Sequence, residues 1–307
     1  MNSRQKFQVY SALGASMAVW GLSFLVTKQV VSVLPVSTLL AMRFLIASVF
    51  LGVWVIARGE LRVPKRDLWV LATLAILSPV GYFLFETHGV ARTQASHASV
   101  IVAIIPAVVF ILAMIFRQER FAWRKALGIG LAYAGVVLVI GVGTSEEGAT
   151  ILGDVLILGA VACASIRTLF AKHVLKRVTP LQLTFYQFLF SLIVFVPLAS
   201  TDGFEWTAKF TGSVLFGVLF LGLFCSALAF LAMHYALVHL PASGVSVAAN
   251  FVPVVTLIAE VALYGAAPSW PKLAGMVMVI GGMVLAQAMT RNTGESGRRM
   301  LPGRVGG

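Results

Sequence analysis

Apolar residues fall in ten long runs along the chain, and each run is bounded by charged residues, proline or a polar turn. The runs cover residues 8–28, 35–57, 67–87, 93–115, 124–142, 152–171, 180–199, 212–235, 241–264 and 270–289. Most are long enough, as helices rising about 1.5 Å per residue, to cross about 30 Å of hydrocarbon. A membrane barrel would instead show short segments of alternating polarity. The pattern therefore predicts an all-α, polytopic membrane protein with ten transmembrane helices.

Basic residues are distributed unevenly between the loops that these runs define. With the N-terminus in the cytoplasm, the cytoplasmic loops and termini hold 17 of the 23 Lys and Arg residues, and the external loops hold four. The positive-inside rule then predicts that both termini are cytoplasmic. Basic cytoplasmic loops therefore account for the net charge of +12, which then does not indicate binding of nucleic acid.

Composition supports a protein of the inner membrane. Hydrophobic residues make up 59% of the chain and charged residues 11%, against about 25% charged in soluble domains. Two cysteines exclude a disulfide scaffold, and 21 Phe with 6 Trp exclude a disordered chain. The first run is too long for the apolar part of a signal peptide, so we expect none.

The two halves of the chain resemble each other at a shift of 147 positions. At that shift, Ser96, Ser99, Val100, Pro106, Val108, Trp123, Lys125, Gly128 and Gly135 match Ser243, Ser246, Val247, Pro253, Val255, Trp270, Lys272, Gly275 and Gly282. Because five spans per half is an odd number, the second half must enter the membrane inverted. The sequence predicts inverted five-helix repeats at 8–142 and 152–289 and a cytoplasmic basic tail at 290–307. Inverted repeats are typical of secondary transporters.

Several short motifs give the chain a family resemblance. They are Trp20-Gly21 in the first run, a proline in the fourth, Gln118-Glu119-Arg120 after it, and Gly128 and Gly135 in the fifth. Over roughly residues 8–290 the sequence resembles the EamA-type exporters of the drug/metabolite transporter superfamily. Within that family it is most similar to bacterial exporters of aromatic amino acids and other metabolites. One departure is Ala266, where the family commonly has an acidic residue.

Candidate substrate contacts are polar or aromatic residues at the middle of the predicted spans. They are Trp20, Tyr82, Ser99, Gln187, Ser246 and Asn250. Aromatic rings could stack on a substrate, and the Asn250 amide could bind a carboxylate or an amine. The alternative for each is packing or hydrogen bonding between helices. Pro106 and Pro253 are candidate hinges, because proline frees a backbone carbonyl inside a helix.

The charged residues inside the runs are weaker candidates for the substrate site. Arg43 could attract a carboxylate or form a structural pair, and Arg167 is expected to reach the cytoplasmic interface. Glu86 and Glu260 are expected at hydrated external ends, which favours facilitated diffusion or weak proton coupling. The paired glycines of the fifth and tenth runs predict close helix packing and leave a homodimer open.

The leading prediction is a secondary transporter that exports amino acids, aromatic ones favoured, by alternating access. Its partners are a small-molecule substrate and the lipid bilayer. The sequence holds no zinc, nucleotide or nucleophile motif, so we expect neither a cofactor nor an enzyme. The alternatives are a transporter of another metabolite class, such as a sugar or a drug-like cation, and a membrane-embedded enzyme or a channel.

Overall fold

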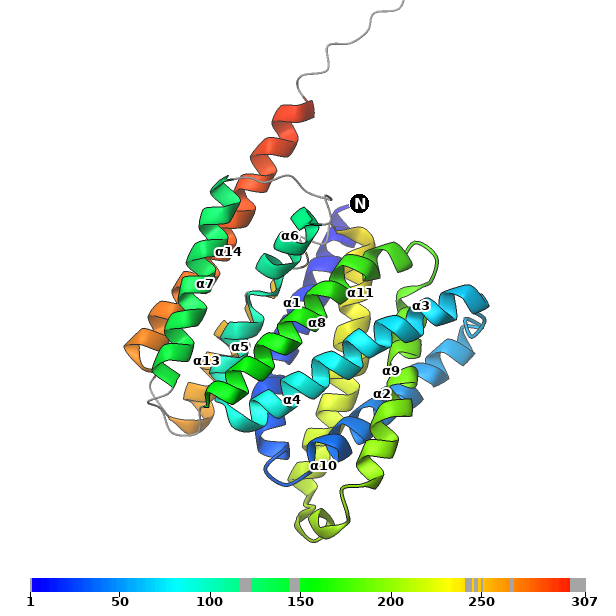
Figure 1. Ribbon diagram of the computed structural model, residues 1–307. Coiled ribbons are helices and arrows are strands. Elements are labelled where there is room, and N and C mark those ends of the chain that lie inside the picture. The colour runs from blue at the N-terminus through cyan, green and yellow to red at the C-terminus, as the bar shows by residue number, and fades with distance from the viewer. Residues whose placement is uncertain are drawn as a thin grey trace, which may run out of the picture.

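The regular structure of the chain is entirely helical in the residues that the computed structural model describes (Figure 1). These residues are 2–115, 123–143, 150–240, 245, 248–249, 251–265 and 268–298. The all-α class is therefore confirmed.

The helices follow one another in the order that the apolar runs predict. The first half contains α1 (Ser3–Val30), α2 (Val36–Ala57), α3 (Lys65–Ala75), η1 (Ile76–Gly81), α4 (Tyr82–Arg92), α5 (Ala95–Val102), α6 (Ile105–Ile115) and α7 (Trp123–Gly143). The second half contains α8 (Ile151–Val174), α9 (Pro180–Ser200), η2 (Glu205–Lys209), α10 (Gly212–Leu219), η3 (Phe220–Leu228), α11 (Ala229–His239), α13 (Phe251–Tyr264) and α14 (Trp270–Arg298).

Seven helical stretches in this part of the chain are long and apolar enough to cross a membrane, by length and composition. They are Ser3–Val30, Val36–Ala57, Lys65–Arg92, Ala95–Leu112, Ile151–Val174, Pro180–Ser200 and Gly212–His239. Two shorter apolar helices, Ala126–Val139 and Phe251–Tyr264, fall within the predicted fifth and ninth runs. The count of ten spans and the inversion of the second half remain predictions.

Two of the predicted spans are interrupted by π-helical segments. In the third span, η1 contains Ser78, whose φ of −158° and ψ of 122° are extended, followed by Pro79, which has no N–H to donate. In the eighth span, η3 joins α10 to α11. A π-helical segment shifts the hydrogen-bonding pattern and re-aims the side chains and carbonyls after it. Ser78 of η1 lines the cavity described below, and the Cys225 carbonyl of η3 accepts a hydrogen bond from Trp20 in its wall.

The fourth span is also discontinuous, because α5 ends at Val102 and α6 begins at Ile105. Pro106 is the second residue of α6, and Pro253 is the third residue of α13. Both prolines therefore lie in the first turn of a helix, where the missing N–H removes no intrahelical hydrogen bond. Helices broken within a span are common at the substrate sites of transporters.

Helices α7 and α14 pack side by side, and the predicted close packing of their glycines is confirmed (Figure 1). A Cβ atom added to Gly135 would lie 2.6 Å from the carbonyl oxygen of Gly275. One added to Gly282 would lie 2.4 Å from the carbonyl oxygen of Gly128. These glycines therefore serve packing within one chain.

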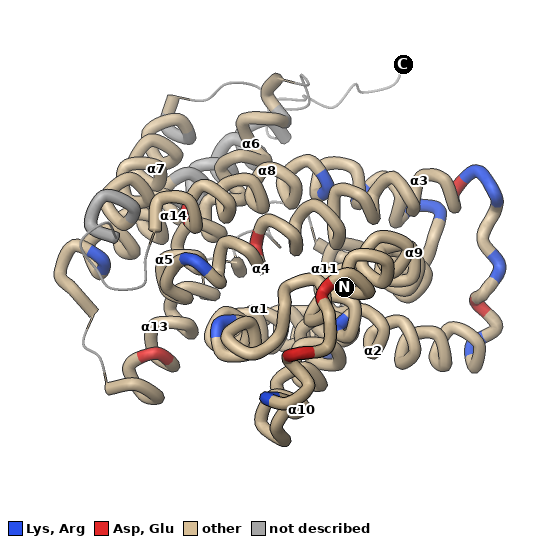
Figure 2. Tube along the Cα trace, turned by 60° about the horizontal axis from the view of Figure 1, so that its bottom comes forward, with Lys and Arg blue, Asp and Glu red and all other residues tan. Residues whose placement is uncertain are grey.

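The remaining helices mix the two halves of the sequence. Helix α1 packs against α11 and α13, α2 against α9, and α4 against α8. Between them, the ring of Phe44 stacks on Phe188 and Phe195 at centroid distances of 5.2 and 5.3 Å. Figure 2 shows basic residues gathered on the loop that joins α2 to α3, whereas most of the helical surface is uncharged.

Candidate functional site

A cavity lies where α1, η1, α4, α8 and α11 converge between the two halves. The cavity has a volume of about 110 Å³. One water needs roughly 10–15 Å³ of such volume, so the space suits a small organic molecule better than an isolated water.

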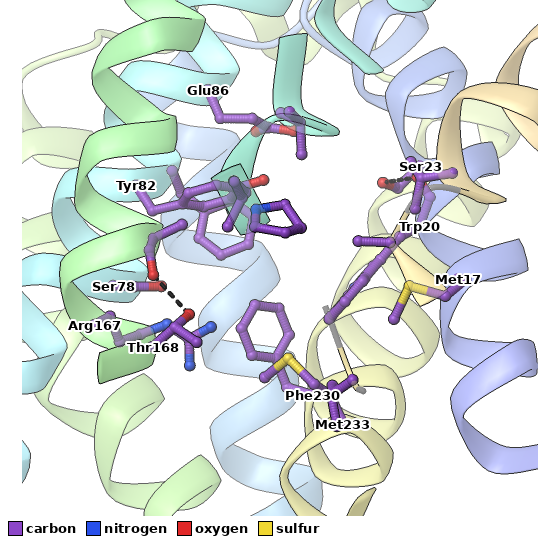
Figure 3. A pocket seen from close by; sticks show the side chains of 18 of the residues that line it. Met17, Trp20, Ser23, Ser78, Tyr82, Glu86, Arg167, Thr168, Phe230 and Met233 are labelled. Carbon is purple, nitrogen blue, oxygen red and sulfur yellow. Dashed lines mark hydrogen bonds between the residues drawn. The ribbon is translucent and has the colours of Figure 1, made fainter. Parts of the chain in front are cut away.

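Aromatic side chains form much of the cavity wall. The rings of Trp20 and Phe230 meet edge to face at a centroid distance of 5.1 Å, and those of Tyr82 and Phe83 do so at 4.8 Å. Figure 3 shows Trp20 and Tyr82 on opposite sides of the cavity, with Phe230 near its lower end. The indole N–H of Trp20 donates to the carbonyl of Cys225 in η3 at 2.9 Å. The π-helical segment thus fixes the orientation of the ring.

Three charged side chains line the same cavity: Arg43, Glu86 and Arg167. They are almost fully buried, with exposed fractions of 1%, 3% and 6%. The Arg43 Nε–H donates to Ser226 Oγ at 2.7 Å, and its Cζ lies 4.3 Å from the ring centroid of Phe83. A Glu86 oxygen accepts a hydrogen bond from the Thr87 hydroxyl at 3.0 Å.

Two of these positions correct the sequence analysis. Glu86 was expected in a hydrated external end, but α4 continues to Arg92 and turns the Glu86 carboxylate into the cavity. Arg167 was expected to reach the cytoplasmic interface, but α8 continues to Val174 and the guanidinium stays inside. A charge at such depth must face protein or water, because lipid does not solvate it.

Arg167 is held by a polar chain that crosses three helices. Its Nη1 lies 3.3 Å from His234 Nε2 on α11, and His234 Nδ1 lies 2.8 Å from Thr184 Oγ1 on α9. All three residues are buried. This chain joins one edge of the cavity to the packed interior behind it.

The structure brings only some of the predicted site residues together. Trp20, Tyr82 and Pro106 line the cavity. Ser99 and Gln187 are buried but do not line it; the Ser99 hydroxyl donates to the carbonyl of Ser96 at 2.8 Å. Pro253 is buried in α13 and does not line the cavity, although its neighbour Val252 does. Ser246 and Asn250 lie outside the described residues.

The candidate list from the sequence did not include Arg43, Glu86 or Arg167. The signal for them was present, because an ionisable residue inside an apolar run is costly unless it has a use. Their convergence was not visible, because they come from α2, α4 and α8. No group of three His, Cys, Asp or Glu in the described part of the chain could hold a metal ion.

An aromatic and charged cavity among apolar helices is typical of multi-pass membrane transporters of small molecules. The EamA-like transporter family matches residues 9–141 and, a second time, residues 151–287. The chain belongs to this family and carries two copies of its domain. The resemblance stated from the sequence is confirmed.

Full-length relatives agree with this assignment. An uncharacterized transporter of Archaeoglobus fulgidus is 28% identical over 94% of this chain and 99% of its own length. A probable terminal-alkyne amino-acid exporter of Streptantibioticus cattleyicolor is 26% identical over 95% of this chain and 97% of its own length. One protein of known crystal structure, 18% identical, has the same fold, with a TM-score of 0.71 over 92% of this chain and 99% of its own.

Proposed function

We propose that this transporter exports amino acids, with aromatic side chains favoured, from the cytoplasm across the inner membrane. The observation that carries the proposal is one cavity among the described residues that combines an aromatic wall with charged groups of both signs. An amino acid with an aromatic side chain offers matching surfaces: a flat apolar ring, a carboxylate and an ammonium group.

The relative of Streptantibioticus cattleyicolor supports the substrate class, because it is named a probable amino-acid exporter. The cavity wall supports the preference for aromatic side chains. Trp20, Tyr82 and Phe230 offer ring faces and edges to a ligand, and such contacts stabilise by about 0.5–1.5 kcal/mol beyond the burial of area. A sugar would need more hydrogen-bonding groups than this wall supplies.

Alternating access is proposed to move the two halves about the cavity, as inverted-repeat transporters do. The break between α5 and α6, with Pro106 beside it, and the segments η1 and η3 are the proposed points of bending. Pro253 is proposed as the matching hinge in the second half. Ser99, Gln187, Ser246 and Asn250 remain proposed contacts from their sequence positions, in a state of the transporter with its cavity open.

Counterflow in proteoliposomes tests the function. Vesicles loaded with unlabelled phenylalanine should accumulate radiolabelled phenylalanine, tyrosine and tryptophan transiently, and alanine less, without ATP. Protein-free vesicles are the control. Counterflow of a sugar or of a lipophilic cation, with none for any amino acid, would contradict the proposal.

A further inference from the structure

We propose that the guanidinium of Arg167 binds a carboxylate of the transported molecule, so that the protein selects carboxylates and rejects amines that lack one. The inference deepens the proposed function, and it rests on that function in using the same cavity. It names the group that a substrate must carry and the side chain that recognises it.

The first step is the direction of the hydrogen bonds behind Arg167. The Thr184 hydroxyl donates its proton to the carbonyl of Pro180 at 2.6 Å. Its oxygen can therefore only accept from His234, 2.8 Å away, which places the imidazole proton on Nδ1. His234 Nε2 then carries a lone pair and accepts from Arg167 Nη1 at 3.3 Å. His234 is neutral in this arrangement, so it positions the guanidinium without compensating its charge.

The second step is the unsatisfied side of the guanidinium. Arg167 Nε is buried and has no hydrogen-bond partner. Within the described residues the structure also gives Nη2 no partner and Arg167 no ion pair. Nη2 can donate to a carboxylate in the cavity, and a shift of the side chain that uncovers Nε would complete a fork of two parallel hydrogen bonds. A buried charge left without such a partner is costly, which indicates a group that arrives from the cavity.

The third step is the charge of the cavity as a whole. Its described lining carries two guanidinium groups, Arg43 and Arg167, against one carboxyl group, Glu86, which leaves at least one excess positive charge. Arg43 is already engaged, because Ser226 accepts from its Nε, its Cζ lies over Phe83, and Glu86 attracts it electrostatically. The excess charge therefore belongs to Arg167. It attracts an anionic group and repels a ligand whose only charge is an ammonium.

The position of Arg167 also orients the substrate. Figure 3 shows Arg167 and Glu86 at opposite ends of the cavity, with Tyr82 between them. The Arg167 Cζ lies 5.9 Å from the ring centroid of Phe230, which itself packs against Trp20. A carboxylate on Arg167 places the remainder of the molecule against these rings.

Three ligands with the same phenyl ring test the inference: phenylalanine, 3-phenylpropionate and phenethylamine. Their dissociation constants are measured by calorimetry on the purified protein. Wild type should bind the two carboxylates and bind phenethylamine at least about tenfold more weakly, the scale of one charge-assisted fork. Arg167→Gln should weaken both carboxylates at least about tenfold and strengthen the binding of phenethylamine, because the repulsion of its ammonium group is removed. Arg66→Gln, at an exposed position of α3, is the matched control and should behave as wild type.

Thr184→Val provides a second test. It keeps the Arg167 guanidinium and removes the hydroxyl that hydrogen-bonds with His234. It should weaken both carboxylates by a smaller factor than Arg167→Gln, and Thr184→Ser should restore the affinity. These two variants decide the question if Arg167→Gln does not fold.

The outcomes separate the inference from the proposed function. Unchanged carboxylate affinity in folded Arg167→Gln, or equal binding of phenethylamine and phenylalanine to wild type, overturns the inference even where amino acids are transported. Arg167-dependent binding of 3-phenylpropionate, with no counterflow of any amino acid, supports the inference and overturns the proposed function.

Discussion

Trp20 is fixed at the cavity wall by its hydrogen bond to Cys225 and its edge-to-face contact with Phe230. Trp20→Ala should therefore remove stacking area from the site. We expect the KM for phenylalanine counterflow to rise roughly five- to tenfold, the scale of one aromatic pair, and the KM for alanine to change little. Trp69→Ala is the matched control, because Trp69 is 78% exposed on α3. An equal rise of KM for both substrates would contradict stacking of the substrate side chain on Trp20.

Glu86 is the one acidic residue among the described residues of the cavity wall. Glu86→Gln would raise the excess positive charge there. We expect the affinity for 3-phenylpropionate to increase, by roughly tenfold for one unit charge at intermediate dielectric, and the affinity for phenylalanine to increase less, because its ammonium group loses a partner. Calorimetry on both ligands measures this difference. Equal changes for the two ligands would contradict a contact between Glu86 and the ammonium group.

For single residues, the sequence predicted the aromatic side chains of the cavity wall better than its charged side chains. Trp20 and Tyr82 could be singled out because aromatic residues at mid-span lie away from the membrane interface. The burial of Glu86 and Arg167 depends on how far α4 and α8 continue beyond them. The hydrogen bonds from Arg167 through His234 to Thr184 join three helices. A single sequence does not show which residues of separate helices face each other.

Among the helix pairs, α7 and α14 show most directly how packing depends on single glycines. A Cβ at Gly282 would lie 2.4 Å from the carbonyl oxygen of Gly128, so Gly282→Ala must push the helices apart. We expect a loss of about 1–3 kcal/mol in the free energy of unfolding, the usual cost of overpacking. Thermal unfolding in detergent measures the effect. Gly281→Ala is the control from the same helix, because nothing lies within 4 Å of its added Cβ; similar losses in both variants would contradict the packing.

The interruptions of the helices were only partly predictable. Pro79 and Pro106 mark two of them, because proline cannot donate the hydrogen bond that continues a helix. The π-helical segment η3 contains no proline, and its sequence from Phe220 to Leu228 reads as an ordinary apolar helix. The segment packs against α1 and α2, and its local sequence does not reveal these contacts.

In the whole molecule, the two halves are interleaved through the pairs α1–α11, α2–α9, α4–α8 and α7–α14. The sequence repeat predicted two related halves, and the family matches both. It did not predict how the helices of the two halves pair, because a residue that occurs in both halves does not specify which helix it contacts. Figure 1 shows the N-terminus and the C-terminal end of α14 toward the same end of the molecule.

The orientation that the basic loops predict can be tested by labelling. With Cys163 and Cys225 replaced by alanine, a cysteine at Lys209 should react with an impermeant thiol reagent in intact cells. One at Arg62 should react only after lysis. Both positions are exposed in the structure, so access to the protein surface does not limit either reaction. Labelling of Arg62→Cys from outside would reverse the orientation and, with it, the positive-inside argument.

The central claim, that substrate passes through the cavity between the halves, is tested most directly by filling that cavity. Ala164 on α8 lines it, whereas Ala162 on the same helix is exposed on the outer surface. In proteoliposomes, Ala164→Phe should fold but lose nearly all phenylalanine counterflow, because its ring occupies the substrate's space, and Ala162→Phe should keep the wild-type rate. Wild-type counterflow by folded Ala164→Phe would show that substrate takes another path.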